Sequence, residues 1–206
     1  MLPLLSVGDV LRKEGEVVIH ASHLSDAEFL AFCENNPLLS IERDWERNII
    51  VMPPADSFGD SRNAEFTTDL AVWNRALPTP GITFGPSAGF TLPSGVVKSP
   101  DGSWISAARW NAVPPALRAP FPHIAPDFIA EIMSPSDRLP KAQEKMEEFR
   151  AAGVRLGWLI DRTARTVSIY RADGSVETLD DPATVSGDPE MPGLVVDMAR
   201  VFRQTL

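Results

Sequence analysis

The chain has 206 residues, a formal net charge of −9 and a pI of about 4.8. This acidic balance gives the whole molecule no attraction to nucleic acid or to an anionic membrane, so a nucleic-acid role needs a local positive groove or a bound metal ion. The single cysteine, Cys33, excludes an internal disulfide and a cysteine-based zinc site, and no apolar run is long enough to span a membrane. The simplest location for such a chain is the cytoplasm.

Residues 1–38 predict an N-terminal helical arm packed on a core domain that occupies residues 39–206. Within the arm, Glu16–Ile19 is a plausible short strand and Ser25–Asn35 is a helix. Ser25 and Glu28 have the spacing of a capping box, which marks the start of this helix.

Two strands are expected next, at Leu39–Arg43 and Asn48–Met52, with a hairpin turn at Asp44–Arg47 between them. Pro53-Pro54 ends the second strand because proline cannot donate to a sheet ladder. Helical spacing then runs over Ser61–Ala76.

The rest of the chain alternates short strands and helices. The expected strands are Ile82–Phe84, Gly89–Leu92, Gly95–Val97, one entered through Ser99–Ser106, the strand around Glu131, Leu156–Asp161, Thr166–Tyr170, Val176–Leu179 and one within Gly193–Asp197. The expected helices are Ala107–Ala112, Leu139–Ala152 and a short one that ends near Phe202. This order predicts a mixed α/β fold in which helices flank a central mixed β-sheet.

The strand around Glu131 is an apolar run between Pro126 and Pro135, a pattern typical of a strand buried on both faces of a sheet. An ionised carboxylate in such a run is strongly unfavourable unless a cation or hydrogen-bond donors compensate it. Glu131 therefore lies either near the solvent at the strand end or beside a positive group.

Asp101 is the second acid at a strand end, and the two carboxylates converge if their strands are neighbours. A hard divalent cation would relieve their repulsion, and Mg²⁺ commonly takes one or two protein carboxylates together with a substrate phosphate. The alternative for Asp101 is an ordinary turn, because Ser-Pro-Asp-Gly is a common turn sequence.

Lys145 lies on the predicted helix at the border of its apolar stripe, about 80° from the stripe centre at 100° per residue. That stripe is formed by Leu139, Ala142, Met146 and Phe149. A border lysine can reach a carboxylate or a phosphate at a strand end. Alternatively, it is a surface lysine paired with a glutamate of its own helix, at position 144 or 148.

Three further acids could contribute to such a site. Glu42 lies in the first strand pair, Glu65 lies on the first long helix, and Asp127 shares Glu131's side of its strand. None of the three stands out by its spacing alone.

Several motifs together resemble the Uma2 family, which is placed in the PD-(D/E)xK nuclease superfamily. The resemblance runs from about Ser40 to Phe202. The motifs that carry it are Asp101–Ser106, Ala125–Asp137, Gln143–Phe149 and Gly153–Asp161, with support from Ile41–Arg43, Ile49–Pro53 and Ser61–Glu65.

The resemblance implies a restriction-endonuclease-like core and a Mg²⁺-dependent endonuclease, with Mn²⁺ as an alternative ion, that acts on nucleic acid and preferably on DNA. Pro100-Asp101 matches the PD motif and Glu131 matches the next acid. Met133 occupies the usual lysine position, and Lys145 matches the lysine that has moved to the next helix in this family. Glu42 matches a recurrent acid.

From these matches we expect Asp101, Glu131 and the Ile132 carbonyl to bind the metal ion, and Lys145 and Glu42 to take part in catalysis. Superfamily members often act as dimers, so a homodimer is expected.

Two other functions are compatible with the sequence. The first is a catalytically inactive nuclease-like module that binds nucleic acid or protein, which the acidic balance favours. The second is a scaffold or dimer partner, which exposed tryptophans would indicate.

Overall fold

A computed structural model of the protein describes residues 16–37, 39–52, 57–134 and 137–203. The first 15 residues of the predicted arm, the predicted strand stop at Pro53-Pro54, and Pro135 with Ser136 lie outside the described residues. The predicted boundary between residues 38 and 39 stays a prediction.

The central element is a six-stranded mixed sheet in the order β11-β10-β9-β8-β7-β4. Its strands are β4 (Ile82–Phe84), β7 (Gly102–Ile105), β8 (Phe128–Met133), β9 (Leu156–Asp161), β10 (Thr166–Arg171) and β11 (Val176–Asp180). In this sheet β8 and β9 run parallel and the other neighbours are antiparallel. The chain crosses from β8 to β9 through helix α5 (Leu139–Ala151), as a parallel pair requires.

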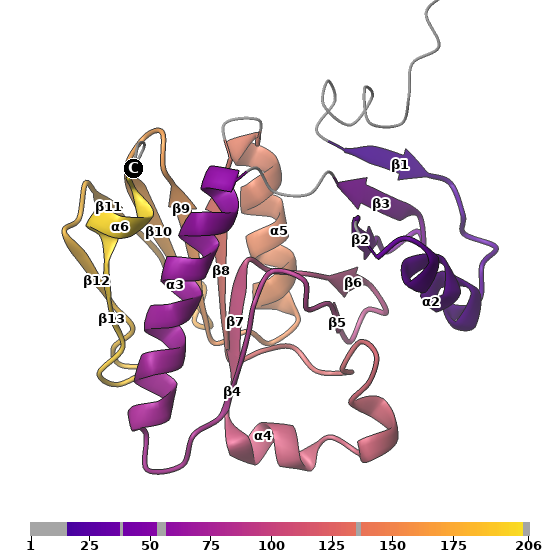
Figure 1. Ribbon diagram of the computed structural model, residues 1–206, viewed down its shortest axis with the longest axis horizontal. Coiled ribbons are helices and arrows are strands. Elements are labelled where there is room, and N and C mark those ends of the chain that lie inside the picture. The colour runs from indigo at the N-terminus through magenta and orange to yellow at the C-terminus, as the bar shows by residue number, and fades with distance from the viewer. Residues whose placement is uncertain (1–15, 38, 53–56, 135–136, 204–206) are drawn as a thin grey trace, which may run out of the picture.

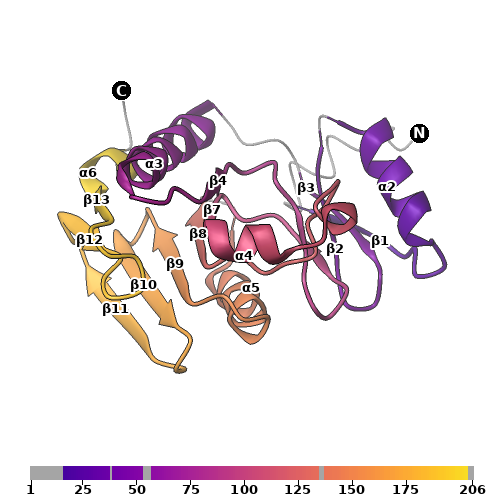
Figure 2. The ribbon, with the colours of Figure 1, turned by 90° about the horizontal axis from the view of Figure 1, so that it is seen from below.

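Helices cover both faces of this sheet. Helix α5 lies on one face, and helix α3 (Ser57–Ala76) lies on the other, as the two ribbon views show (Figure 1, Figure 2). Near α3 lie helix α6 (Met198–Val201) and the two-stranded sheet of β12 (Thr184–Ser186) and β13 (Val195–Asp197). The predicted α/β class with helices flanking a central mixed sheet is therefore confirmed.

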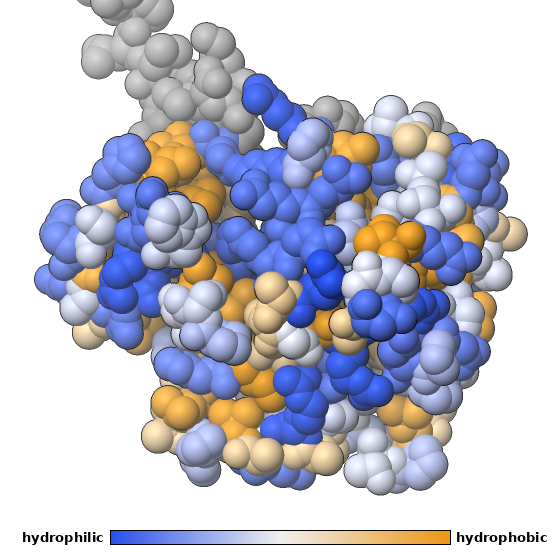
Figure 3. Space-filling model, turned by 180° about the vertical axis from the view of Figure 1, so that it is seen from behind, coloured by the Kyte–Doolittle hydropathy of each residue, from blue (hydrophilic) through white to orange (hydrophobic). Residues whose placement is uncertain are grey.

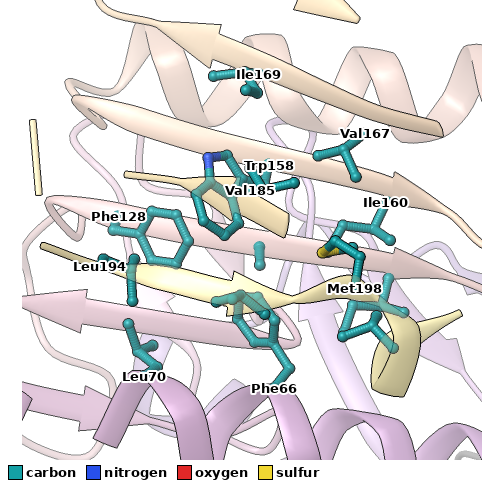
Figure 4. Packing of buried hydrophobic residues seen from close by; sticks show 14 of the residues in the cluster. Phe66, Leu70, Phe128, Trp158, Ile160, Val167, Ile169, Val185, Leu194 and Met198 are labelled. Atoms are coloured by element: carbon teal, nitrogen blue, oxygen red, sulfur yellow. The ribbon is translucent and has the colours of Figure 1, made fainter. Parts of the chain in front are cut away.

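The face of the sheet that α3 covers carries the largest apolar core. Phe66 and Leu70 of α3 point toward Phe128 on β8 and Trp158 on β9, all of them almost fully buried (Figure 4). The Phe128 and Trp158 rings meet edge to face with their centroids 5.1 Å apart, a favourable aromatic geometry.

A second, antiparallel sheet stands beside the first, in the order β1-β3-β2-β6-β5 (Figure 1). Its strands are β1 (Val17–Ile19), β2 (Ser40–Arg43), β3 (Ile49–Met52), β5 (Phe90–Thr91) and β6 (Val97–Lys98). Helix α2 (Asp26–Asn35) packs Phe29 against apolar residues of this sheet, including Ile41 and Val51. The sequence did not predict that the strands divide into separate sheets, because strand pairing depends on contacts far apart along the chain.

Several local predictions are confirmed by the structure. The Ser25 side chain accepts a hydrogen bond from the Glu28 N–H and the Ser25 N–H donates to the Glu28 carboxylate, which is the capping box of α2. Gly153 follows α5 with φ of +100°, a conformation that favours glycine.

Several details differ from the sequence predictions, among them the start of α3, which lies at Ser57 and not at Ser61. Leu139 was expected on the buried stripe of α5, but as the first residue of the helix it is 42% exposed. The 3₁₀ helix η1 (Pro115–Leu117) lies in the proline-rich loop, where no element was predicted. The strand β12 was missed because its three residues give almost no periodic signal.

Helix α4 (Ala107–Ala112) completes the described elements of the central region. Seen from behind, apolar side chains form small groups that hydrophilic residues separate (Figure 3). Among the described residues, no helix is both long enough and apolar enough to cross a membrane.

Candidate active site

The Lys145 ammonium group lies between two buried carboxylates. Its Nζ is 2.9 Å from Glu42 Oε1 and 2.9 Å from Glu131 Oε1. It also donates a hydrogen bond of 3.1 Å to the carbonyl oxygen of Ser99. These three contacts occupy all three N–H groups of the ammonium, and they join α5 to β2, to β8 and to the segment between β6 and β7.

Alternation along β8 explains why Glu131 meets this helix. Ile129 and Met133, two residues to either side of Glu131, belong to the apolar cluster that includes Met146 and Phe149 of α5. Successive strand residues point to opposite faces, so Glu131 also points to the face that α5 covers. Lys145 lies next to Met146 on the helix, and its side chain is 19% exposed, as expected for the border of the apolar stripe.

Asp101 lies opposite Glu131 across the neighbouring strands. Gly102 pairs with Ala130 in the antiparallel register. One position further along, Asp101 therefore lies opposite Glu131. The Asp101 carboxylate accepts a hydrogen bond of 2.7 Å from the Ile132 N–H and one of 3.0 Å from the Asn63 side-chain amide. Both oxygens of Asp101 are therefore held in a fixed orientation.

Pro100 precedes Asp101 and cannot donate a backbone hydrogen bond to a neighbouring strand. Extended two positions beyond the pair of Gly102 and Ala130, the register of β7 and β8 brings Pro100 opposite Ile132. Proline has no N–H to donate there. Because the N–H and C=O of one strand residue point to the same side, the Ile132 carbonyl faces the strand from which Asp101 comes. The Asp101 and Glu131 carboxylates thus lie beside each other, and the Ile132 backbone lies next to them through its hydrogen bond to Asp101.

Electrostatic effects at the two metal-site candidates favour a cation. Burial raises the pKa of Glu131 to about 8, and the Asp101 and Glu42 carboxylates add to this although Lys145 opposes it. Burial also raises the pKa of Asp101 above its usual range, against the Ile132 hydrogen bond and the Lys145 charge. The negative charge of this pair is only partly compensated by the surrounding protein.

The pKa shifts of Lys145 and Glu42, in contrast, favour the charged form of each side chain. Burial alone would lower the pKa of Lys145, but the Glu131 and Glu42 carboxylates outweigh it and raise the pKa. For Glu42, burial acts to raise the pKa, but the Lys145 and Lys98 charges outweigh it and lower the pKa. Lys145 is therefore a stable cation at neutral pH and not a proton acceptor.

A second lysine, Lys98, extends this charge network and was not among the predicted residues of this site. Its Nζ lies 3.5 Å from Glu42 Oε2 and 3.0 Å from Glu148 Oε2. Lys98 is only 7% exposed because it lies on β6, next to β2, and faces α5. Acidic and basic side chains therefore alternate in one continuous network of ion pairs, in the order Glu131, Lys145, Glu42, Lys98 and Glu148. Asn63 was not singled out either, since only its position on α3 brings it to Asp101.

The donor set fits a hard divalent cation. Mg²⁺ prefers oxygen ligands, keeps several waters and commonly takes only one or two protein carboxylates. Asp101, Glu131 and the Ile132 carbonyl would supply such oxygens. The described part of the chain has no group of three or more His, Cys, Asp or Glu side chains that could hold a metal ion.

The other candidate acids lie elsewhere. Asp127 is buried and accepts a hydrogen bond from the Ser106 N–H, and Arg109 lies 3.1 Å from its carboxylate. Glu65 is partly exposed near Arg200. The alternative pairing of Lys145 within its own helix does not occur, because Glu148 pairs with Lys98 and Lys145 with Glu42 and Glu131.

The sheet order and the helix that joins its two parallel strands define a restriction-endonuclease-like α/β fold. The chain shares this fold with the crystal structure of "a putative nuclease belonging to DUF820" from Anabaena variabilis, with a TM-score of 0.66 and 23% sequence identity over 79% of this chain and 89% of that chain.

The chain belongs to the Uma2 family, whose model, described as "Putative restriction endonuclease", matches residues 26–199. The resemblance predicted from the motifs is thereby confirmed. No curated protein sequence matches the chain. Family and fold together support a nuclease.

Proposed function

We propose that the chain is a Mg²⁺-dependent endonuclease that hydrolyses phosphodiester bonds of nucleic acid, preferably DNA, with Mn²⁺ as an alternative ion. One observation carries the proposal: Lys145 bridges Glu42 and Glu131 at 2.9 Å each, beside Asp101 on the neighbouring strand. In the proposal, these three acids and one cationic side chain surround the place of the scissile phosphate.

Each residue has a definite role in the proposal. Asp101, Glu131 and the Ile132 carbonyl would hold the ion, which would polarise a phosphoryl oxygen and lower the pKa of a bound water. Lys145 would stabilise the charge that develops on the scissile phosphate and orient the attacking water. Because all three of its N–H groups have partners, a substrate oxygen would replace one of them, and Glu42 would keep the ammonium in place.

The test is incubation of the purified protein with single- and double-stranded DNA and RNA, with Mg²⁺, with Mn²⁺ and with a chelator. The variants Asp101→Asn and Glu131→Gln remove a charge with little change in shape. Each should lower the cleavage rate by about 100-fold or more, the scale on which one transition-state group acts. Glu144→Gln, on the exposed side of α5, is the matched control and should keep the wild-type rate. Cleavage that survives in the Asp101 and Glu131 variants would reject the proposal.

The second candidate is a nuclease-like module that binds nucleic acid or protein without cleaving it. The net charge of −9 favours the protein-binding form of this module, because non-specific binding of DNA depends on many contacts from Lys and Arg. The same incubation decides between the two, since a binding module would retain nucleic acid and leave it intact. The expected homodimer is tested separately by the molar mass in solution.

A further inference from the structure

A hollow of about 270 Å³ lies apart from the acid and lysine site. It is formed by the start of α2, the hairpin between β2 and β3, and the segments around Leu92 and Ile124. Its volume is slightly below the usual range for small-molecule sites, about 300–1,000 Å³, so it suits a small ligand. Arg43 lines it, whereas the preceding residue of β2, Glu42, pairs with Lys145, so the hollow lies on the opposite face of β2.

Arg43 is a buried and rigidly held cation in the wall of this hollow. It is only 4% exposed, and its guanidinium carbon lies 4.7 Å from the centroid of the Phe29 ring. Its Nη1 donates to Asp26 Oδ1 at 2.9 Å, and its Nη2 donates to the Gly95 carbonyl at 3.3 Å. Its Nε is buried and has no hydrogen-bond partner among the described residues. A buried donor without a hydrogen-bond partner destabilises the folded state. The contribution of this N–H to stability therefore does not explain why it is buried here.

Arg47 adds a second guanidinium from an unusual backbone position. It ends the hairpin turn with φ of +66°, where glycine or asparagine is the usual residue. Its Nη2 donates to Asp26 Oδ1 at 2.8 Å and to the Leu24 carbonyl at 2.9 Å, while Nε and Nη1 take part in neither bond. The side chain is 42% exposed, so it can offer these donors to a ligand.

The charge of the hollow is positive, although the molecule as a whole is strongly acidic. Two guanidinium groups share a single oxygen of one carboxylate, which leaves a formal charge of +1, and His123 also lines the hollow. One arginine would have been enough to neutralise Asp26. Paired N–H groups of guanidinium match the oxygens of carboxylates and phosphates, so the excess charge selects an oxyanion.

We propose that this hollow binds a small organic oxyanion, a carboxylate or a phosphate monoester. Its charged group would contact Arg47 and Arg43, and its apolar part would lie against Leu92 and Ile124. This assignment does not depend on the proposed nuclease activity, because the hollow shares no side chain with the Lys145 site.

Calorimetric titration of the purified chain at constant ionic strength tests the proposal, with inorganic phosphate, phenyl phosphate and benzoate as probes. We expect saturable binding of phenyl phosphate or benzoate, and weaker binding of inorganic phosphate because it lacks an apolar part. The stronger of the two organic probes identifies the charged group as phosphate or carboxylate.

Arg47→Gly removes the guanidinium and suits the left-handed backbone conformation, so this variant should fold. It should weaken binding by about tenfold or more, as loss of a hydrogen bond to a charged group does. Arg75→Ala removes the same charge from an exposed position on α3 and should leave the affinity unchanged within about twofold. If Arg47→Gly does not fold, His123→Ala takes its place, and weaker binding is again the expected result.

The proposal is overturned if none of the three probes binds saturably. It is also overturned if the Arg47→Gly variant, or His123→Ala in its place, binds as well as the wild type, or if Arg75→Ala weakens binding equally. No cleavage is measured, so failure of the proposed nuclease would leave this outcome unaffected.

Discussion

Replacing Lys145 by methionine tests the central ion pairs directly. Methionine is unbranched and one atom shorter than lysine, and it removes the cation that Glu42 and Glu131 share. Breaking a buried ion pair by removing one partner costs about 3–5 kcal/mol, because the remaining charge is left uncompensated. All three side chains are less than one-fifth exposed, so this range applies with little screening by solvent.

The expected cost is at the lower end, about 3 kcal/mol. Lys98 still lies 3.5 Å from Glu42, and Glu131, with a pKa of about 8, can take up a proton instead of remaining an unpaired charge. For a chain of this size, a loss of about 3 kcal/mol lowers the melting temperature by about 6–12 °C.

Urea unfolding followed by circular dichroism measures this loss, with Lys141→Met as the control. Lys141 lies one turn earlier on α5, its side chain is 54% exposed, and it pairs with Glu16, so its replacement should cost at most about 1 kcal/mol. Added Mg²⁺ should stabilise Lys145→Met more than the wild type, since the ion no longer competes with the ammonium for Glu131. If the two lysine variants are equally stable, Lys145 does not compensate these acids and the reasoning is refuted.

The same unfolding assay checks three further predictions. Folding raises the pKa of Glu131 from 4.5 to about 8, so between these pH values the folded state holds a proton that the unfolded chain releases. The free energy of unfolding should therefore fall as the pH rises from about 4.5 to about 8. The variant Glu131→Gln should show a smaller fall over the same pH range. Asp127→Ala should lower the free energy of unfolding by about 1.5–3 kcal/mol, because it removes the hydrogen bond from the Ser106 N–H and the Arg109 ion pair. Stabilisation by Mg²⁺ should stay unchanged in this variant. Loss of the Mg²⁺ effect would show that Asp127 belongs to the metal site. Gly81→Ala should lower the free energy of unfolding by about 3 kcal/mol, because the added Cβ would lie 2.2 Å from the Ile105 carbonyl oxygen. A variant as stable as the wild type would show that the backbone shifts to make room for the Cβ.

Features that depend on neighbouring residues could be predicted from the sequence. The capping box of Ser25 and Glu28 and the helix end at Gly153 are set by local geometry, and both are present. The alternation of β8 and the helical position of Lys145 were enough to place an acid and a cation on facing surfaces.

Features that depend on strand pairing could not be predicted. Lys98 lies on a strand of two residues, and its partners come from β2 and α5, so no local pattern marks it as part of the site. Asn63 reaches Asp101 only because α3 lies across the sheet. Glu42 was assigned through the family resemblance, since its spacing from Lys145 along the chain carries no structural signal.

The three partners of Lys145 have a consequence for how the molecule acquires its chemistry during folding. They belong to segments separated by as many as 103 positions, from Glu42 to Lys145, and contacts between such distant segments form late because each must close a long loop first. A partly folded chain, or a fragment released by a protease, would therefore lack the bridge between these acids. This cluster of ion pairs is therefore complete only when both sheets have packed against α5.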